Sequence, residues 1–243
     1  MNIEDFPQIG GLMVSKMVVE KNIKPNFMYR EKRSFPNDSG WRIFTGLESQ
    51  DYIDNPDNSA IYNPSTILKI DLSIAPILLK GIGAVYEKNV DTSEWDKVTD
   101  FELEDDYLVT HQLTDKWTID INNLFERRQE ENGDTLYTTG DKSVRLIIWN
   151  EIDKSKKEIE TEQKESIVNR NQSLSKTLDV FNFSDDKVSK VGYLIKEKDG
   201  EKSYSVIYGT SIIDNEVLET ALYFDELEDF NWAIETWKSI KVT

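Results

Sequence analysis

Apolar residues along this chain follow two different spacings, and these spacings predict a mixture of strands and helices. In residues 117–121 apolar and polar side chains alternate, which indicates a strand with one buried face. Near the C-terminus, four apolar residues lie at spacings of three, four and three, which places them on one side of a helix. They are Leu227, Phe230, Ile234 and Trp237. We expect this helix to pack on a sheet as part of a core.

The first ninety residues contain short apolar segments separated by turn-forming residues. We expect strands at residues 26–30, 41–45 and 84–87, and a buried strand or short helix at residues 10–19. A helix is expected over residues 63–70, because the segment opens with Asn as an N-cap and Pro at the first helical position. This part of the chain therefore predicts a small α+β domain.

Turn signals in the second half divide its apolar runs into hairpins. One hairpin joins residues 135–138 to residues 143–149, and another joins residues 191–196 to residues 203–209 through an Asp-Gly turn. Residues 151–170 are polar with few apolar positions, which predicts a helix lying shallowly on a sheet.

The last helix is expected to follow Asp225 as its cap, because Glu228 stands three residues further on and completes a capping box. Two hairpins, a further strand at residues 217–224 and two helices predict an antiparallel sheet with helices packed on it. The fold class expected for the whole chain is α+β.

Charge is distributed unevenly and indicates where one domain ends. Residues 1–90 hold 11 acidic and 10 basic residues, whereas residues 91–243 hold 35 acidic and 19 basic residues. The polar stretch between these regions has little periodicity. We therefore predict two small domains, residues 1–92 and 115–243, with a linker or covering segment at residues 93–114.

Composition excludes several kinds of chemistry. The chain of 243 residues has no Cys and one His, so a zinc site or a Ser-His-Asp triad would need His111. His111 lies in an alternating segment, and we interpret it as a surface or strand residue. No phosphate-loop or Gly-x-Ser-x-Gly motif occurs, so we expect no cofactor, no metal and no enzymatic activity.

The net charge of −17 bears on partners and location. It repels phosphate groups, so neither nucleic acid nor an anionic membrane is expected as a partner. No apolar run approaches the roughly 20 residues that cross a bilayer, and the N-terminus lacks the pattern of a secretory signal. We therefore expect a cytoplasmic protein.

Asp51, Asp54 and Asp57 repeat every three residues in a segment rich in Asn and Pro. A calcium loop is one hypothesis, but the alternating acids, the central Gly and the terminal Glu of such a loop are missing. We interpret the segment instead as a loop braced by side chains that cap its own backbone N–H groups.

Residues 29–58 gather the residue types that dominate binding hot spots. Trp, Tyr and Arg bury a large area while keeping a polar group available to a partner. The candidate partner-binding residues are Tyr29, Arg30, Asp38, Trp41, Arg42, Asp51, Tyr52, Asp54, Asn55 and Asn58. In the alternative interpretation, Trp41 and Phe44 belong to the core. Arg42 then forms an ion pair with Asp38 or Asp51.

The motifs Ser39-Gly-Trp-Arg42 and Asp54-Asn-Pro-Asp57 resemble a bacterial family of immunity proteins from polymorphic toxin systems. The resemblance covers about residues 8–90. It implies a cytoplasmic antitoxin role and supplies no catalytic residue. Residues 115–243 more loosely resemble the PsbP-like sandwich, whose small bacterial members usually serve as binding or accessory modules.

Three functions are compatible with these features. The preferred one is a non-enzymatic immunity protein that occludes a toxin domain, with a basic toxin favoured because opposite charge speeds association. The second is an adaptor or structural protein that forms a homodimer through a sheet edge or a Trp-rich surface. The third is a carboxylate-dependent hydrolase, which needs two acids in one aromatic cleft.

Overall fold

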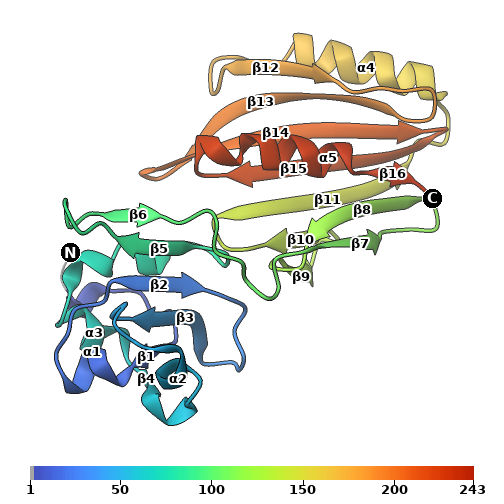
Figure 1. The fold of residues 1–243 in the computed structure, drawn as a ribbon. Coiled ribbons are helices and arrows are strands. Elements are labelled where there is room, and N and C mark those ends of the chain that lie inside the picture. The colour runs from blue at the N-terminus through green and yellow to red at the C-terminus, as the bar shows by residue number, and fades with distance from the viewer. Residues whose placement is uncertain (1–2) are drawn as a thin grey trace. The chain divides into compact units, whose positions relative to one another are not determined.

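The computed structural model describes residues 3–243, which form two compact units (Figure 1). The second unit begins at Leu108. Each unit contains β-sheet with helices packed on it, which confirms the predicted α+β class. The segment at residues 93–114, predicted as a linker or covering segment, contributes a strand to each unit. These strands are Trp95–Lys97 in the first unit and Leu108–Gln112 in the second.

A six-stranded sheet in the order β4-β1-β3-β2-β5-β6 forms the centre of the first unit. β1 and β3 are parallel, and all other neighbours are antiparallel. The strands are β1 (Gly11–Ser15), β2 (Phe27–Arg30), β3 (Asp38–Phe44), β4 (Ser59–Tyr62), β5 (Val85–Lys88) and β6 (Trp95–Lys97). The strands predicted at residues 26–30, 41–45 and 84–87 are β2, β3 and β5.

Short helical segments precede and connect these strands. They are η1 (Ile3–Asp5), α1 (Lys16–Glu20), α2 (Gln50–Ile53), η2 (Pro56–Asn58), α3 (Pro64–Leu68), η3 (Leu72–Ile74) and η4 (Ile77–Leu79). Asn63 caps α3 as predicted, because its Oδ1 accepts a hydrogen bond from the backbone N of Ser65 at 2.9 Å. Residues 10–19 form both a strand and a helix, since β1 runs directly into α1.

The core of the first unit lies between the sheet and its helical segments. Met28, Trp41 and Ile43 project from β2 and β3 and are fully buried. They pack in one cluster with Ile67 of α3 and Leu78 of η4. Burying a large apolar side chain contributes about 1.5–3 kcal/mol, so this cluster is the main source of stability in the first unit.

The second unit contains a seven-stranded antiparallel sheet and a three-stranded antiparallel sheet. Their orders are β12-β13-β14-β15-β11-β10-β9 and β16-β8-β7. The strands are β7 (Leu108–Gln112), β8 (Trp117–Asn122), β9 (Glu126–Gln129), β10 (Thr135–Thr138), β11 (Lys142–Asn150), β12 (Thr177–Asn182), β13 (Ser189–Asp199), β14 (Lys202–Ile213), β15 (Glu216–Phe224) and β16 (Lys241–Val242). Both predicted hairpins, β10–β11 and β13–β14, are present.

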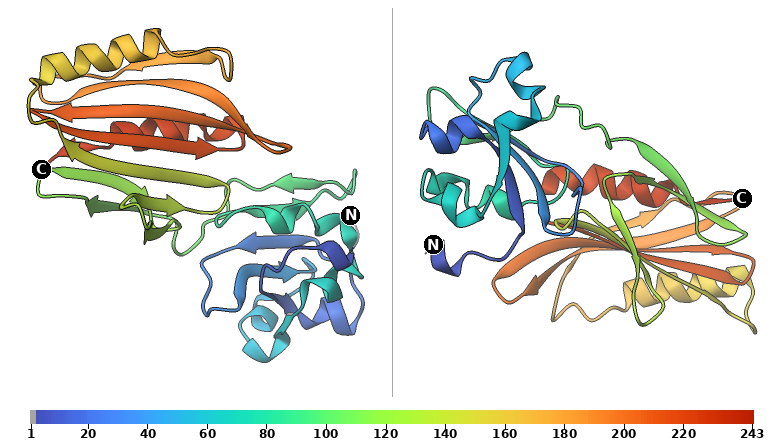
Figure 2. Two further views of the ribbon diagram at one scale, coloured as in Figure 1. Left: turned by 180° about the vertical axis from the view of Figure 1, so that it is seen from behind. Right: turned by 90° about the horizontal axis from the view of Figure 1, so that it is seen from below.

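Two longer helices lie on opposite faces of the seven-stranded sheet (Figure 2). The helical segments are α4 (Lys156–Val168), η5 (Leu227–Asp229) and α5 (Phe230–Lys238). α4 begins with a capping box between Ser155 and Glu158. Only Ile159 and Ile167 of α4 are buried, so this helix packs shallowly, as its polar sequence predicts.

The core of the second unit forms around α5, which contacts both β15 and β8. Trp237 is fully buried, and its Nε1 donates to Ser211 Oγ at 3.2 Å. The indole lies on Gly209 of β14, where an added Cβ would be 2.4 Å from a ring atom. Glycine is needed at this position because the ring leaves no room for a side chain.

The start of the last helix differs from the prediction. α5 begins at Phe230, and Asp225 forms an ion pair with Lys202 at 2.9 Å instead of capping the helix. Leu227–Asp229, just before Phe230, form the 3-10 turn η5. Its tighter winding rotates these side chains away from the apolar face predicted for the helix. Leu227 is consequently 73% exposed, and the apolar stripe is reduced to its last three members.

Candidate partner-binding site

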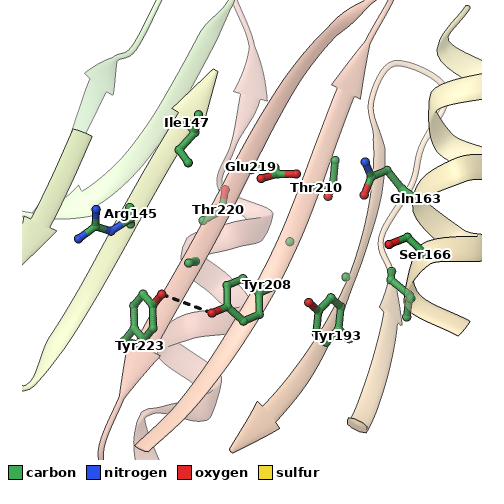
Figure 3. A pocket seen from close by; sticks show the side chains of 14 residues that line it. Arg145, Ile147, Gln163, Ser166, Tyr193, Tyr208, Thr210, Glu219, Thr220 and Tyr223 are labelled. Atoms are coloured by element: carbon green, nitrogen blue, oxygen red, sulfur yellow. Dashed lines mark hydrogen bonds between the residues drawn. The ribbon is translucent and has the colours of Figure 1, made fainter. Parts of the chain in front are cut away.

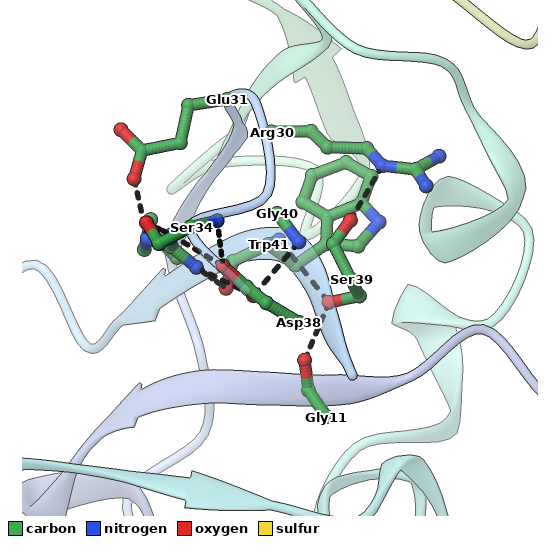
Figure 4. Close-up of polar contacts among 9 residues, drawn as sticks. Gly11, Arg30, Glu31, Ser34, Asp38, Ser39, Gly40 and Trp41 are labelled. Carbon is green, nitrogen blue, oxygen red and sulfur yellow. Dashed lines mark hydrogen bonds and ion pairs between the residues drawn. The ribbon is translucent and has the colours of Figure 1, made fainter. Parts of the chain in front are cut away.

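Arg42 joins Asp38 and Glu31 into one charged network, and Figure 4 shows these two acids beside the start of β3. Its Nη2 and Nη1 donate to the two carboxylate oxygens of Asp38 at 2.8 and 3.0 Å, and its Nε donates to Glu31 at 2.7 Å. Asp38 and Arg42 are both buried. The arrangement matches the alternative interpretation of Arg42, with Asp38 rather than Asp51 as the partner.

The network keeps both of its buried members charged. Burial acts to raise the pKa of the Asp38 carboxyl, but hydrogen bonds from Arg42, Ser34 and Gly40 outweigh it and hold that pKa below its usual value. Burial likewise acts to lower the pKa of Arg42, and the two carboxylates outweigh it. If Arg42 turned outward, Asp38 would be buried without a counter-charge, and if Asp38 turned outward, Arg42 would keep only Glu31.

The residues between these two charges fasten β3 to its neighbours. Ser39 Oγ donates to the Gly11 carbonyl at 2.7 Å, and Trp41 Nε1 donates to the Leu78 carbonyl at 3.1 Å. Gly40 has a φ of +82°, and a Cβ there would lie 2.2 Å from a backbone oxygen. The Ser-Gly-Trp-Arg motif is therefore part of the scaffold, and Trp41 lies in the core.

Tyr29 and Arg30 point to opposite sides of β2. The Arg30 side chain donates to two backbone carbonyls, those of Ser39 and Lys80, so it also serves the scaffold. Tyr29 lies on the other side, where its ring centroid is 5.1 Å from that of Phe101. Tyr29 therefore belongs to a partly buried aromatic cluster of the first unit.

The remaining candidates lie together between β3 and β4. We call residues 47–58 the acidic loop, because they hold four acidic residues and no basic one. Asn58 Nδ2 donates to the Tyr52 carbonyl at 2.9 Å, and Tyr52 OH donates to the Asn58 carbonyl at 3.3 Å. Asn55 Oδ1 accepts from the backbone N of Asp57 at 3.0 Å. These bonds brace the loop, which contains the short helical turns α2 and η2.

The acidic loop presents charged and apolar side chains to solvent. The carboxylates of Asp51 and Asp57 have no hydrogen-bond or ion-pair partner within residues 3–243. Asp54 accepts a hydrogen bond from Gln50 at 2.7 Å. Leu47 is 70% exposed and Ile53 is 44% exposed. Unpaired charges and apolar groups on a braced backbone suit binding, because little conformational freedom is then lost on association.

Other residues of this region were not expected from the sequence. Glu31 joins the Arg42 network from beyond β2, and Phe101 covers Tyr29. Residues 91–107 hold eight acidic residues and one basic residue and lie in the first unit, which therefore carries more negative charge than its first ninety residues indicate. The run of acids is visible in the sequence. That it belongs to the first unit is shown by the pairing of β6 with β5.

Within residues 3–243, no group of three or more His, Asp or Glu side chains is arranged to hold a metal ion. The three aspartates of the acidic loop are therefore not gathered as calcium ligands would be. Over the same residues, no helix combines the length and the apolarity of a membrane span. His111 lies in β7, with its ring centroid 5.0 Å from that of Tyr137.

Among solved structures, the chain is similar in fold to several proteins of low sequence identity. The PsbP protein of the cyanobacterium Synechocystis is 8% identical over 60% of this chain and 97% of its own, with a TM-score of 0.43. The Ran-binding protein Mog1p of Saccharomyces cerevisiae is 13% identical over 56% of this chain and 95% of its own, with a TM-score of 0.37. A Bacteroides thetaiotaomicron protein is 10% identical over 52% of this chain and 45% of its own, with a TM-score of 0.41.

These likenesses concern the fold alone, and a PsbP protein is among them. No curated protein matches the sequence. Residues 12–99 match the family model described as the immunity protein Imm33 domain. The matched range includes the Arg42 network and the whole acidic loop. The resemblance of residues 8–90 to immunity proteins is thus confirmed by a match of the first unit to this family model.

Proposed function

We propose that this chain is an immunity protein that binds a toxin domain in the cytoplasm and blocks its active site. The match of residues 12–99 to an immunity protein domain carries the proposal. Such a domain implies a protein as the partner. Occlusion needs no catalytic group of its own, which agrees with a chain that has one His and no Cys.

The acidic loop is the surface that we assign to the partner. Among residues 3–243, Asp51 and Asp57 have no hydrogen-bond or ion-pair partner, and Leu47 and Ile53 are exposed beside them in the sequence. Clustered apolar side chains with a charged rim are typical of binding surfaces. Trp41, which is buried, supports the strand from which the loop departs and does not contact the partner.

A basic toxin domain fits the charge of the first unit. Residues 1–107 hold 19 acidic and 11 basic residues, and the acidic loop contains no basic residue at all. Enzymes that attack nucleic acid present Lys and Arg to phosphate groups. An acidic partner is attracted to that same surface, which speeds association and places the inhibitor over the active site.

Co-expression with toxin candidates tests the function. Each toxin domain encoded beside this gene is expressed in a sensitive bacterium with and without the chain. We expect the chain to restore growth against one of them and to co-purify with it. The proposal fails when no neighbouring toxin candidate is neutralised or bound.

A pair of substitutions tests the surface separately from the function. The double variant Asp51→Asn, Asp57→Asn removes two unpaired carboxylates and should weaken toxin binding by about tenfold, since an exposed charge pair contributes up to about 1 kcal/mol. The control variant Asp186→Asn, Glu201→Gln removes the same charge from exposed positions of the second unit. If the two variants bound the toxin with equal affinity, the toxin would contact a surface other than the acidic loop.

The adaptor hypothesis makes a different prediction about assembly. An immunity protein of the kind proposed is expected to form a one-to-one complex with its toxin. An adaptor that acts through a sheet edge is expected to be a homodimer without any partner. Light scattering of the purified chain, alone and with the toxin, distinguishes the two.

A further inference from the structure

A cavity of about 270 Å³ lies on the face of the seven-stranded sheet that α4 partly covers (Figure 3). Three tyrosines on adjacent strands line it, Tyr193 of β13, Tyr208 of β14 and Tyr223 of β15. The ring centroids of Tyr193 and Tyr208 are 5.5 Å apart, and those of Tyr208 and Tyr223 are 6.4 Å apart. The cavity therefore has an aromatic wall.

Glu219 of β15 is the only carboxylate among the residues that line this cavity. Its cross-strand neighbours are Ile147 and Thr210, and neither carries a charge. Within residues 3–243 the Glu219 side chain has no hydrogen-bond or ion-pair partner. Burial raises the pKa of its carboxyl, because an unpaired charge is costly away from water.

Arg145 is the cation that β11 places diagonally across from Glu219. Its guanidinium binds Asp134 instead, at 3.0 Å, and approaches Glu130 at 3.9 Å. Figure 3 shows the Arg145 side chain extending away from the tyrosines. Arg145 also lines the cavity, but its ion pair is with Asp134, so within residues 3–243 no cation forms an ion pair with Glu219.

The tyrosine wall suits a cation as well as apolar groups. The negative face of an aromatic ring attracts cations, and Arg170 already makes this contact, with its guanidinium carbon 5.4 Å from the centroid of the Tyr193 ring. Tyr208 OH donates to Glu197 at 3.1 Å, which orients that ring. A positively charged head group with an apolar stem matches both the carboxylate and the wall.

We propose that this cavity binds a primary alkylammonium group, which pairs with Glu219 while its methylene groups lie against the tyrosine rings. A free small amine and a lysine side chain both carry this chemistry. The inference concerns the second unit and is independent of the toxin partner assigned to the acidic loop. Its success or failure leaves the proposed function unaffected.

Calorimetric titration of the full chain tests the proposal with three probes. n-Butylamine supplies the charged group, butan-1-ol supplies a similar uncharged chain, and Nα-acetyl-lysine methylamide supplies a lysine side chain. We expect butylammonium to bind at least about tenfold more tightly than butanol, because a charged hydrogen bond to Glu219 is lost in the alcohol. Tighter binding of the lysine compound identifies a protein ligand, and tighter binding of butylammonium identifies a free amine.

Glu219→Gln is the decisive variant. It should weaken butylammonium binding by at least about tenfold. It should also raise the free energy of unfolding at pH 7, because it removes a partly buried unpaired charge, so a loss of binding cannot reflect a failure to fold. Glu201→Gln, at an exposed turn, makes the same change of charge and should bind normally. Equal binding by the wild type and Glu219→Gln, or no binding of butylammonium to the wild type, would overturn the proposal.

Discussion

At the residue scale, Asp38 accepts four hydrogen bonds, two from Arg42 and one each from the backbone N of Ser34 and of Gly40. Asp38→Ala leaves the buried Arg42 with Glu31 as its remaining counter-charge. We expect a loss of about 3 kcal/mol in the free energy of unfolding, measured by urea denaturation, since losing one partner of a buried ion pair is costly even where the partly exposed Glu31 remains.

The exposed Asp54 provides the matched control for this substitution. Asp54→Ala removes an acid of the acidic loop and should change the free energy of unfolding by no more than about 0.5 kcal/mol. Similar losses in the two variants would mean that the Arg42 network does not stabilise the first unit.

Lys190 is a buried charge of the second unit with a defined role. Its Nζ donates to the carbonyls of Trp237, Lys238 and Ile240 at 3.5, 2.9 and 2.7 Å, which closes the C-terminal end of α5. Burial, aided by the charge of Lys241 and opposed by Asp185, lowers the pKa of Lys190 to about 8.

This lowered pKa predicts a pH dependence of stability. Between pH values of about 8 and 10.5 the unfolded chain retains a proton that folded Lys190 has released. Stability contributed at this position therefore rises with pH across that window, by up to about 3 kcal/mol. We expect the difference in unfolding free energy between the wild type and Lys190→Met, measured in urea at pH 7.5, 9 and 10, to shift in favour of the wild type. A constant difference would contradict the lowered pKa.

At the element scale, local signals identified most helices and strands. Asn63 begins α3 as expected, because an N-cap needs only the next few residues. The strand expected at residues 41–45 is β3, which buries Trp41 and Ile43 on one face. The predicted start of α5 was wrong because the carboxylate of Asp225 forms an ion pair with Lys202, which lies in a hairpin distant in the sequence. A tertiary ion pair of this kind leaves no trace in the local pattern.

The tyrosine cavity was partly accessible from the sequence. The Asp-Gly turn pairs Asp199 with Lys202, and counting back along both strands then places Tyr193 opposite Tyr208. The register of the hairpin therefore predicts that these two tyrosines face each other on adjacent strands. The register alone does not reveal that Arg145 pairs with Asp134 and not with Glu219. Both carboxylates lie on residues near Arg145, and only the structure shows which of them its guanidinium binds.

The acidic loop shows the same limit for the candidate partner surface. Ten residues shared the composition of a hot spot, yet burial separates them into scaffold and surface. Trp41 and Arg42 are buried, whereas Asp51, Asp54 and Asn55 are exposed. Trp and Arg serve cores and interfaces equally well, so composition alone does not decide which role they take.

At the scale of the whole molecule, each unit has its own apolar core. One cluster is built around Trp41 and the other around Trp237, and no residue belongs to both. A separate core is what allows a domain to unfold on its own. We therefore propose that the two units unfold as separate cooperative transitions, which scanning calorimetry of the full chain resolves.

Two substitutions assign these transitions. Asp38→Ala should lower the transition temperature of the first unit and leave the other unchanged. Gly209→Ala should do the reverse, because the new Cβ collides with the Trp237 ring in the second unit. A single transition that either substitution shifts as a whole would instead make the two cores one cooperative system. In that case the acidic loop and the tyrosine cavity would share a common stability, and a ligand of one would stabilise the other.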